Sequence, residues 1–354
     1  MELILGPFLF DKVRGLLLAK SQNLSDNESS RCERVDRMII KLLEPLRVPK
    51  DMIEELAQPI KDMGHEFVYY EEKTTDTNEL IKRSEDADIV MIANNPYPAE
   101  VIEASENLKF INIAFTGVDH VNAEAANKKD IKIANAAGYS NQSVPELAIG
   151  LTLDVYRGIS SGNTEVRSKD FSGQFQGREI KGKTVGIVGT GQLGTRTAEL
   201  FKAFGANLIG YNRSENEEAK ALGMTYHDLE TVMSESDIIS VHLPLTEDTR
   251  GIISKEMLSK MKESAIIINT ARGPVIDSDA LADALNADEI SGAGLDVFDM
   301  EPPIPADYPL LAAKNTVLTP HVGFLTDESM VLRAEIVFEN TLAYLKGKPQ
   351  NLVN

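Results

Sequence analysis

The sequence has little of three things, namely cysteine, basic residues and long apolar runs. Its single cysteine, Cys32, excludes a disulfide within the chain and is typical of a reducing compartment. The 36 lysines and arginines are outnumbered by 55 aspartates and glutamates, and the net charge of -19 disfavours nucleic acid and anionic membrane surfaces as partners. No apolar run approaches the roughly 20 residues of a membrane span. Because the N-terminus also lacks the basic region of a secretory signal, we expect a cytoplasmic protein.

Short apolar runs alternate with helical stretches through most of the 354 residues. The runs that we expect to be strands cover residues 38–44, 67–70, 88–93, 110–115 and 131–134, and then 184–188, 207–211, 237–241, 265–269, 292–297 and 316–320. Such alternation predicts parallel sheets with helices on both faces. The predicted fold class is therefore α/β, with two doubly wound domains.

Four segments stand outside the strand pattern. A long helix is expected from Ser143 and a last one over residues 327–346, whereas residues 160–176 are polar and predicted to be a connection. Residues 1–37 do not fit the scheme, and we expect them to be a dispensable extension, with Met38 as an alternative start. The alternative that residues 2–7 add an edge strand stays open.

The clearest motif is a glycine turn, Gly189-Thr190-Gly191-Gln192-Leu193-Gly194, between an expected strand and an expected helix. Gly189 permits the tight turn, Gly191 lets the backbone approach a pyrophosphate, and Gly194 lets helix and strand pack closely. A pyrophosphate would then lie at the helix N-terminus, where free N–H groups and the helix dipole favour an anion. The context of the motif predicts a dinucleotide site rather than an ordinary turn.

The next expected strand ends at Asn212-Arg213-Ser214. NAD-specific sites carry an acidic residue near this place, and here the position is neutral and followed by an arginine. Arg213 and Ser214 suit a 2′-phosphate, although Glu215, Glu217 and Glu218 weaken such a site. The cofactor is NADP or NAD, and the pattern favours NADP.

Polar residues at the ends of later strands suggest a reaction. Arg272 follows one strand and could bind a carboxylate in bidentate fashion, and His321 follows the last strand and could transfer a proton. Glu301 could orient a histidine and raise its pKa. Each residue alone fits an ordinary structural role, and their joint position at successive strand ends carries the prediction.

Several segments together resemble the D-isomer-specific 2-hydroxyacid dehydrogenase family. The matching segments are GKTVGIVGTGQLG (182–194), SDIISVHLPLTEDTRGII (236–253), IINTARGPVID (267–277), GAGLDVFDMEPP (292–303), TPHVGF (319–324), NLKFINIAFTGVDHVN (107–122) and IKIANAAGYSNQSVPELAIGL (131–151). The resemblance implies a Rossmann nucleotide domain over residues 142–325. It also implies a flavodoxin-like substrate domain over residues 38–141 plus 326–354, with the site between the domains. A homodimer is expected through the nucleotide domain.

The resemblance also implies roles for individual residues. His321 would be the proton donor, Glu301 its partner, and Arg272 the group that binds the carboxylate and carbonyl of the substrate. Dinucleotide contacts would come from Gly189, Gly191, Gln192, Leu193, Gly194, Asn212, Arg213, Ser214, His242, Pro244, Thr249, Thr270, Ala271, Asp296 and Gly323. Asn94, Asn95 and Gly117 would contact the substrate, the first two through backbone N–H groups, and no metal is expected.

The substrate class follows from a further feature. Residues 92–98 lack the basic side chains that would pair with a phosphorylated substrate, so a small unphosphorylated 2-oxo acid such as glyoxylate or hydroxypyruvate is expected. An activity like that of phosphoglycerate dehydrogenase is the first alternative. A protein that senses dinucleotides and acts as a corepressor is an alternative of another class.

Overall fold

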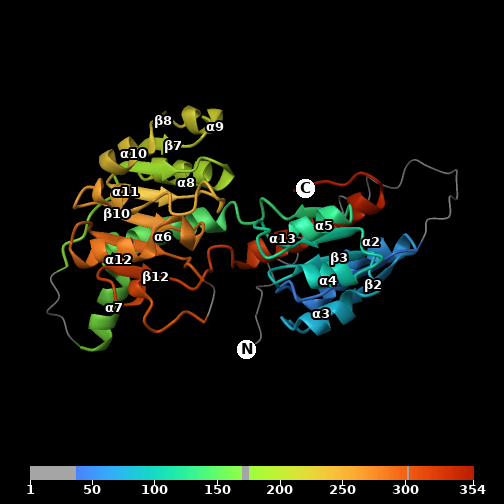
Figure 1. Cartoon of the computed structure of the whole chain (residues 1–354). Coiled ribbons are helices and arrows are strands. Elements are labelled where there is room, and N and C mark those ends of the chain that lie inside the picture. The colour runs from blue at the N-terminus through green and yellow to red at the C-terminus, as the bar shows by residue number, and fades with distance from the viewer. Residues whose placement is uncertain (1–36, 170–174, 301–302) are drawn as a thin grey trace. The chain divides into compact units, whose positions relative to one another are not determined.

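The computed structural model describes residues 37–169, 175–300 and 303–354, and it divides the chain into two compact units (Figure 1). Unit 1 comprises the chain up to Ala137 together with Asp327–Asn354, and unit 2 comprises Gly138–Thr326. Each unit is an α/β structure around one parallel sheet, which confirms the predicted fold class. The extension expected over residues 1–37 lies, except for Arg37, outside the described residues.

Unit 1 is built on a five-stranded sheet in the order β2-β1-β3-β4-β5, with every pair parallel. Its strands are β1 (Ile39–Leu42), β2 (Glu66–Tyr69), β3 (Ile89–Ile92), β4 (Phe110–Ile113) and β5 (Lys132–Asn135). Its helices are α2 (Lys50–Asp62), α3 (Thr77–Ser84), α4 (Ala99–Ala104), α5 (Ala123–Lys128) and α13 (Asp327–Leu345). This strand order is that of flavodoxin-like folds.

The end of the chain is an integral part of unit 1. From the buried strand β4, the Asn112 amide donates to the carbonyl of Val337 in α13 at 2.7 Å. The rings of Phe110 and Tyr344 stack at 4.3 Å between centroids. Beyond α13, the last residues run antiparallel beside β5, where the Val353 N–H donates to the Ile133 carbonyl. The C-terminal segment therefore completes the core of unit 1.

Unit 2 is built on a seven-stranded parallel sheet in the order β12-β11-β10-β9-β6-β7-β8. Its strands are β6 (Thr184–Val188), β7 (Asn207–Tyr211), β8 (Thr225–Tyr226), β9 (Ile238–Val241), β10 (Ile266–Asn269), β11 (Gly292–Leu295) and β12 (Thr316–Leu318). Its helices are α6 (Ser143–Arg157), α7 (Ile159–Arg167), α8 (Gln192–Ala203), α9 (Glu217–Ala221), α10 (Leu229–Glu235), α11 (Lys255–Ser259) and α12 (Ser278–Asn286), with short 3-10 turns η1 (Gly273–Val275) and η2 (Pro309–Leu311). The order is that of a Rossmann sheet extended by one strand.

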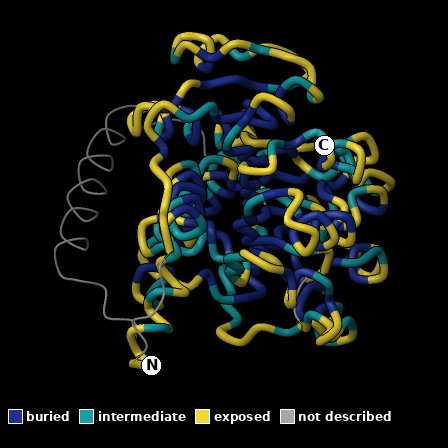
Figure 2. Tube along the Cα trace, turned by 90° about the vertical axis from the view of Figure 1, so that its left-hand side faces the viewer, coloured by how far each residue is buried: buried dark blue, intermediate teal, exposed yellow. Residues whose placement is uncertain are grey.

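The central strands of unit 2 are buried along their whole length (Figure 2). A parallel sheet covered on both faces needs strands that are apolar along their length. Runs such as Ile266–Ile268 could therefore be predicted as strands from the sequence. The strand order reverses between β6 and β9. Ligands bind open α/β sheets at the carboxyl ends of the strands beside such a reversal.

The connection predicted over residues 160–176 is wrong in its first half, because α7 is a helix. None of its residues is buried, and Ile159 and Val166 are each 56% exposed. Its first turn is held by the Asp154 carboxylate, which accepts the N–H of Ser160 at 2.8 Å. A helix held by such local polar bonds has no apolar stripe, so the sequence pattern gave no helical signal.

Candidate functional site

The glycine turn follows β6, and two of its glycines are required by the fold. Gly189 has a φ of +98°, and a Cβ there would lie 2.8 Å from the backbone of His242. A Cβ at Gly194 would lie 1.9 Å from the carbonyl oxygen of Gly189. Both positions therefore exclude a side chain for reasons internal to the protein.

Gly191 differs from these two glycines. Its φ of -69° suits any residue, and a Cβ there would meet no described atom within 4 Å. The protein itself therefore does not need glycine at this position. A Cβ would instead occupy the open face in front of α8, where the N–H groups of the first turn, Gln192 and Leu193 included, have no partner within the helix. The turn thus fits the pyrophosphate of a dinucleotide.

The next strand end carries Asn212, Arg213 and Ser214. Asn212 closes this loop by donating from its amide to the carbonyl of Ser214 at 2.9 Å. Arg213 and Ser214 are exposed, and the Arg213 guanidinium makes no hydrogen bond or ion pair with the described residues. Lys220 pairs with both Glu215 and Glu217. The single charge of Lys220 therefore offsets part of the acidic charge beside the loop.

After β9, His242 faces inward with one ring nitrogen satisfied. Its Nε2 bonds the Ser240 hydroxyl at 2.9 Å, while Nδ1 is buried and has no partner among the described residues. Burial lowers the pKa of His242 to about 4, so the ring is neutral at pH 7. Further along the same loop, Thr249 donates to the carbonyl of Pro244, which closes a turn. These residues shape the site without adding charge.

The end of β10 holds Arg272 through a residue that our sequence analysis did not select. The Asn269 side chain accepts the Ala271 N–H at 3.0 Å and donates to the Arg272 carbonyl at 3.0 Å. Asn269 is buried, so this amide clamps the turn that carries the arginine. Between these positions, the hydroxyl of Thr270 is buried and has no partner among the described residues. A buried orphan of this kind indicates a group supplied by a ligand.

Asp296, at the end of β11, organises the loop that carries His321. Its carboxylate accepts the Thr319 hydroxyl at 2.6 Å and the N–H groups of Val322 at 2.9 Å and Gly323 at 2.8 Å. The His321 N–H donates to the Asp296 carbonyl at 2.8 Å. This network holds His321 at a φ of +53°, which is uncommon for a histidine and is typical of strained functional positions. Two oxygens have about four lone pairs, so Asp296 retains capacity for one ligand donor.

Arg272, Asp296 and His321 thus follow the adjacent strands β10, β11 and β12. A Cβ at Gly273, directly after Arg272, would lie 2.0 Å from the Phe298 backbone, so the ends of β10 and β11 are packed in contact. Glu301, predicted to pair with His321, lies outside the described residues. Its role stays a prediction.

In unit 1, Asn94, Asn95 and Gly117 follow β3 and β4. The backbone N–H of Asn95, expected to bind a substrate carboxylate, instead donates to the buried carboxylate of Glu44 at 2.9 Å. In this structure the N–H thus has an anionic acceptor within the protein, and the substrate contact expected of Asn95 stays a prediction. The Asn95 side-chain amide is fully buried, and neither of its polar atoms has a partner among the described residues.

The same loop contacts a basic residue that the sequence analysis missed. Lys73 donates to the Asn94 side chain at 2.7 Å and lies 3.8 Å from the Glu44 carboxylate. Glu44 follows an apolar strand run, so the rule that selected Arg272 could have found it. Lys73 has no such signal, because only the fold brings it to residues 92–98.

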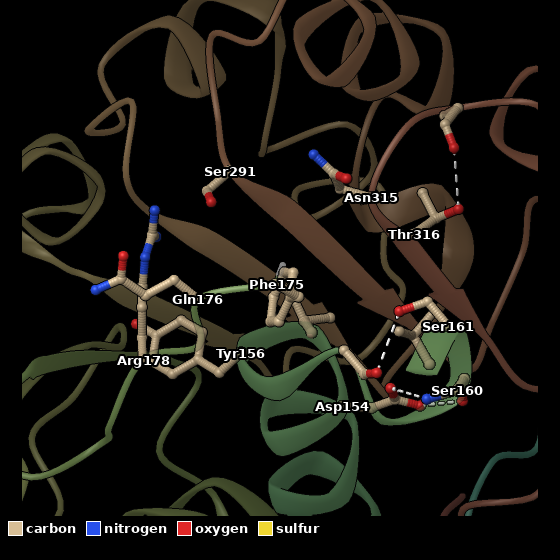
Figure 3. A pocket seen from close by; sticks show the side chains of 14 residues that line it. Asp154, Tyr156, Ser160, Ser161, Phe175, Gln176, Arg178, Ser291, Asn315 and Thr316 are labelled. Carbon is tan, nitrogen blue, oxygen red and sulfur yellow. Dashed lines mark hydrogen bonds between the residues drawn. The ribbon is translucent and has the colours of Figure 1, made fainter. Parts of the chain in front are cut away.

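Two cavities in unit 2 were compared with the strand ends as possible positions of the functional site. The larger, about 390 Å³, lies at the amino ends of β11 and β12, where Ser291, Asn315 and Thr316 line it (Figure 3). Its Asp154 carboxylate bonds Ser160 within the cavity wall (Figure 3), and its one arginine, Arg178, donates to the backbone carbonyl of Ser264. The smaller, about 190 Å³, is apolar and includes His321 in its wall. The strand order and the polar groups therefore favour the carboxyl ends of the strands as the site.

The described residues contain neither a membrane-spanning helix nor a metal cluster. No helix there is long and apolar enough to cross a membrane. In the same part of the chain, no cluster of three or more His, Cys, Asp or Glu side chains is arranged to hold a metal ion.

Comparison with known proteins agrees with this geometry. Residues 149–323 match the family described as D-isomer specific 2-hydroxyacid dehydrogenase, NAD binding domain. The chain is 36% identical over 302 residues to a hydroxypyruvate reductase of Blautia hydrogenotrophica, covering 83% of this chain and 94% of the relative. It is 38% identical over 285 residues to a glyoxylate reductase of Thermofilum pendens, covering 78% of this chain and 84% of the relative.

Among solved structures, an acyclic imino acid reductase in complex with NADPH and D-Arg superposes with a TM-score of 0.80 at 30% identity, covering 90% of this chain and all of that one. The sequence relatives, the fold and the glycine turn lead to the same assignment. The chain belongs to the D-isomer-specific 2-hydroxyacid dehydrogenase family of NAD(P)-dependent oxidoreductases, as its sequence motifs predicted.

Proposed function

We propose that this enzyme reduces a small unphosphorylated 2-oxo acid, such as glyoxylate or hydroxypyruvate, to the D-2-hydroxy acid. The observation that carries the proposal is that three adjacent strand ends bear Arg272, Asp296 and His321, on the same sheet as the glycine turn. The names of the hydroxypyruvate and glyoxylate reductases that it resembles support the substrate class.

Arg272 and His321 have different roles toward the 2-oxo acid in this proposal. The guanidinium of Arg272, on a turn clamped by Asn269, binds the carboxylate and draws charge from the keto oxygen. The ring of His321 gives a proton to that oxygen as it becomes a hydroxyl, and takes one back in the reverse direction. The nicotinamide, when bound, supplies or accepts the hydride. In the proposal Glu301 pairs with His321, and Asp296 adds a contact to the nicotinamide amide.

The remaining residues would hold the nucleotide and the acid. Pyrophosphate contacts are proposed for Gly189, Gly191, Gln192, Leu193 and Gly194, and nicotinamide-side contacts for His242, Pro244, Thr249, Thr270, Ala271 and Gly323. The buried orphan hydroxyl of Thr270 supports its assignment. For the acid, the candidates from unit 1 are the amide of Asn95, which has no partner in the part of the chain that the structure describes, and the backbone of Asn94 and Gly117.

The preferred cofactor in this proposal is NADP(H). Support comes from the guanidinium of Arg213 beside Ser214, which has no partner among the described residues, and from Lys220, which offsets part of the charge of Glu215 and Glu217. An arginine at this place accommodates a 2′-phosphate. The ratio of kcat/KM for NADPH and NADH tests the preference, and a large ratio in favour of NADH would contradict it.

A panel of 2-oxo acids tests the reaction itself. We expect NADPH oxidation with glyoxylate and hydroxypyruvate and little with phosphohydroxypyruvate. A strong preference for the phosphorylated acid would favour the activity like phosphoglycerate dehydrogenase, for which Lys73 offers a cation close to Asn94. Nucleotide binding without turnover on any acid would favour the sensing, corepressor-like alternative.

Assembly and location complete the proposal. A homodimer through unit 2 rests on the family resemblance, and a cytoplasmic location on the single cysteine. Light scattering on the purified protein tests the first, because a monomer mass would contradict it.

A further inference from the structure

Tyr226 joins two segments that sequence motifs treat as separate. It lies in β8, at the edge of the sheet of unit 2. Its hydroxyl donates to the Thr190 hydroxyl oxygen at 2.7 Å and accepts the backbone N–H of Asn216 at 2.9 Å. Thr190 is the buried middle residue of Gly189–Gly191, and Asn216 follows the loop that carries Arg213. One hydroxyl therefore bridges the glycine turn and the end of that loop.

Asn216 forms a second link between the same segments. Its amide nitrogen donates to the Thr190 carbonyl at 2.9 Å and to the Thr195 hydroxyl at 3.3 Å. Its amide oxygen accepts the N–H groups of Glu218 at 2.8 Å and Ala219 at 3.4 Å, and so caps α9. Both donors and both lone pairs of the amide are thus used. The residue cannot move without breaking contacts to the glycine turn, α8 and α9 together.

The loop between these anchors is fixed at both ends. At its start, the Gly189 N–H donates to the carbonyl of Tyr211, the last residue of β7, at 2.8 Å. At its end stand the bonds of Tyr226 and Asn216. Arg213 and Ser214 lie between the two anchors. The guanidinium of Arg213 has no hydrogen-bond partner among the described residues.

We infer that Tyr226 and Asn216 are positioning residues that set the distance between the glycine turn and the Arg213–Ser214 loop. The inference rests on the proposed function, in which the turn holds the pyrophosphate and the loop holds the ribose end of the nucleotide. A loop fixed in advance loses less conformational freedom when the nucleotide binds, and affinity rises accordingly. The two residues act on nucleotide affinity and not on hydride transfer. Both lie at the β7–β8 edge of the sheet, and the strands β6, β9, β10 and β11 separate β7 from β12.

Two substitutions separate positioning from folding. Tyr226→Phe removes the bridging hydroxyl and keeps the ring that packs against the core. Asn216→Ser removes the amide donors to Thr190 and Thr195 and keeps an oxygen that can cap α9, because serine is as good a cap as asparagine. The matched control is Tyr156→Phe, since Tyr156 is a buried tyrosine of the same unit whose hydroxyl, among the described residues, bonds only the Asp237 carbonyl, at 3.4 Å.

Calorimetric titration of the full-length protein with NADPH, and with 2′,5′-ADP as a probe without nicotinamide, measures the effect. Each variant should raise both dissociation constants about 3- to 10-fold, as expected for the loss of neutral hydrogen bonds. The kcat at saturating NADPH should stay within about twofold of wild type, and Tyr156→Phe should leave both constants unchanged.

The inference is overturned if both folded variants bind the two probes as wild type does, or if kcat falls while the dissociation constants do not change. Melting temperatures identify any variant that is unfolded, and if Tyr226→Phe is unfolded, Asn216→Ser decides alone. A wild-type protein that binds neither probe would overturn the proposed function instead, so the two failures are distinguishable.

Discussion

The asparagine amides that follow the strands of the two sheets differ in how many hydrogen bonds they make. In unit 2, Asn216 uses all four of its hydrogen-bonding positions, and Asn269 clamps the turn before Arg272. In unit 1, the amide of Asn95 is fully buried and has no partner among the described residues. Leaving such a group unpaired costs about 1 to 3 kcal/mol. The two amides of unit 2 are therefore fixed by the protein itself, whereas the amide of Asn95 in unit 1, like the hydroxyl of Thr270 in unit 2, has no partner among the described residues.

The largest expected effect tests the chemistry assigned to unit 2. His321→Ala removes the group proposed to transfer the proton, so kcat for 2-oxo acid reduction should fall about 100- to 10,000-fold. Nucleotide affinity should stay unchanged, because the glycine turn lies on other strands. Steady-state rates together with NADPH titration check both parts. Normal turnover by the variant would remove His321 from the mechanism.

The second effect tests whether nucleotide binding, and not folding, requires a glycine at position 191. Gly191→Ala should raise the Kd for NADPH about tenfold or more, which corresponds to about 1.4 kcal/mol, and lower the Tm only slightly. Gly194→Ala is the matched control, since its Cβ would overlap the Gly189 carbonyl and should destabilise the fold itself by about 1 to 3 kcal/mol. Equal loss of stability in both variants would contradict the distinction.

The third effect tests the buried side-chain amide of Asn95 in unit 1, which has no partner among the described residues. Asn95→Leu should leave the free energy of unfolding unchanged or raise it, because it removes a buried polar group without a partner. The same variant should raise the KM for the 2-oxo acid about 3- to 10-fold if the ligand supplies that partner.

Asn112 provides the control for this experiment, because it is equally buried and its amide donates to Val337 and Thr341. Asn112→Leu should destabilise the protein by about 1 to 3 kcal/mol. Denaturant titrations compare the two variants. A marked loss of stability in Asn95→Leu would show that its amide is satisfied within the protein.

The last effect, small over any one pH unit, concerns the pH dependence of stability in unit 2. Burial holds the pKa of His242 at about 4, below its usual 6.5, so the unfolded chain binds a proton more readily than the folded protein between these values. Stability is therefore fully present above pH 6.5 and is lost as the pH falls from about 6.5 to 4, by at most about 1.4 kcal/mol per pH unit. Burial lowers the pKa of His65 as well, so part of the slope belongs to unit 1.

His242→Gln should reduce this slope, as measured by urea unfolding at several pH values between 4.5 and 7. The exposed His227 gives the control, since His227→Gln should leave the slope unchanged. An unaltered slope in His242→Gln would mean that the ring gains a proton in the folded state as easily as in the unfolded one.

Much of the fold could be predicted because parallel strands covered on both faces must be apolar throughout. Strands such as β9 and β10 therefore stand out as continuous runs. The two-residue strand β8 and the fully surface-lying helix α7 have no such pattern, and both were missed. Local periodicity reports burial, so elements held by local polar bonds or by an edge position escape it.

The residues of the candidate site also divide into those that the sequence predicted and those that it did not. The glycine turn, Arg272 and His321 could be found because each directly follows an apolar strand. Asn269 was passed over as the last strand residue, although its amide clamps the arginine turn. Tyr226 and Lys73 act across loops that only the tertiary structure closes, so no spacing along the chain identifies them.

The most direct test of the account identifies the product. Wild-type protein is incubated with NADPH and hydroxypyruvate, and the glycerate formed is quantified and its configuration determined. The account predicts one D-glycerate for each NADPH oxidised. Formation of the L isomer, or nucleotide binding with no glycerate formed and no other 2-oxo acid reduced, would contradict it.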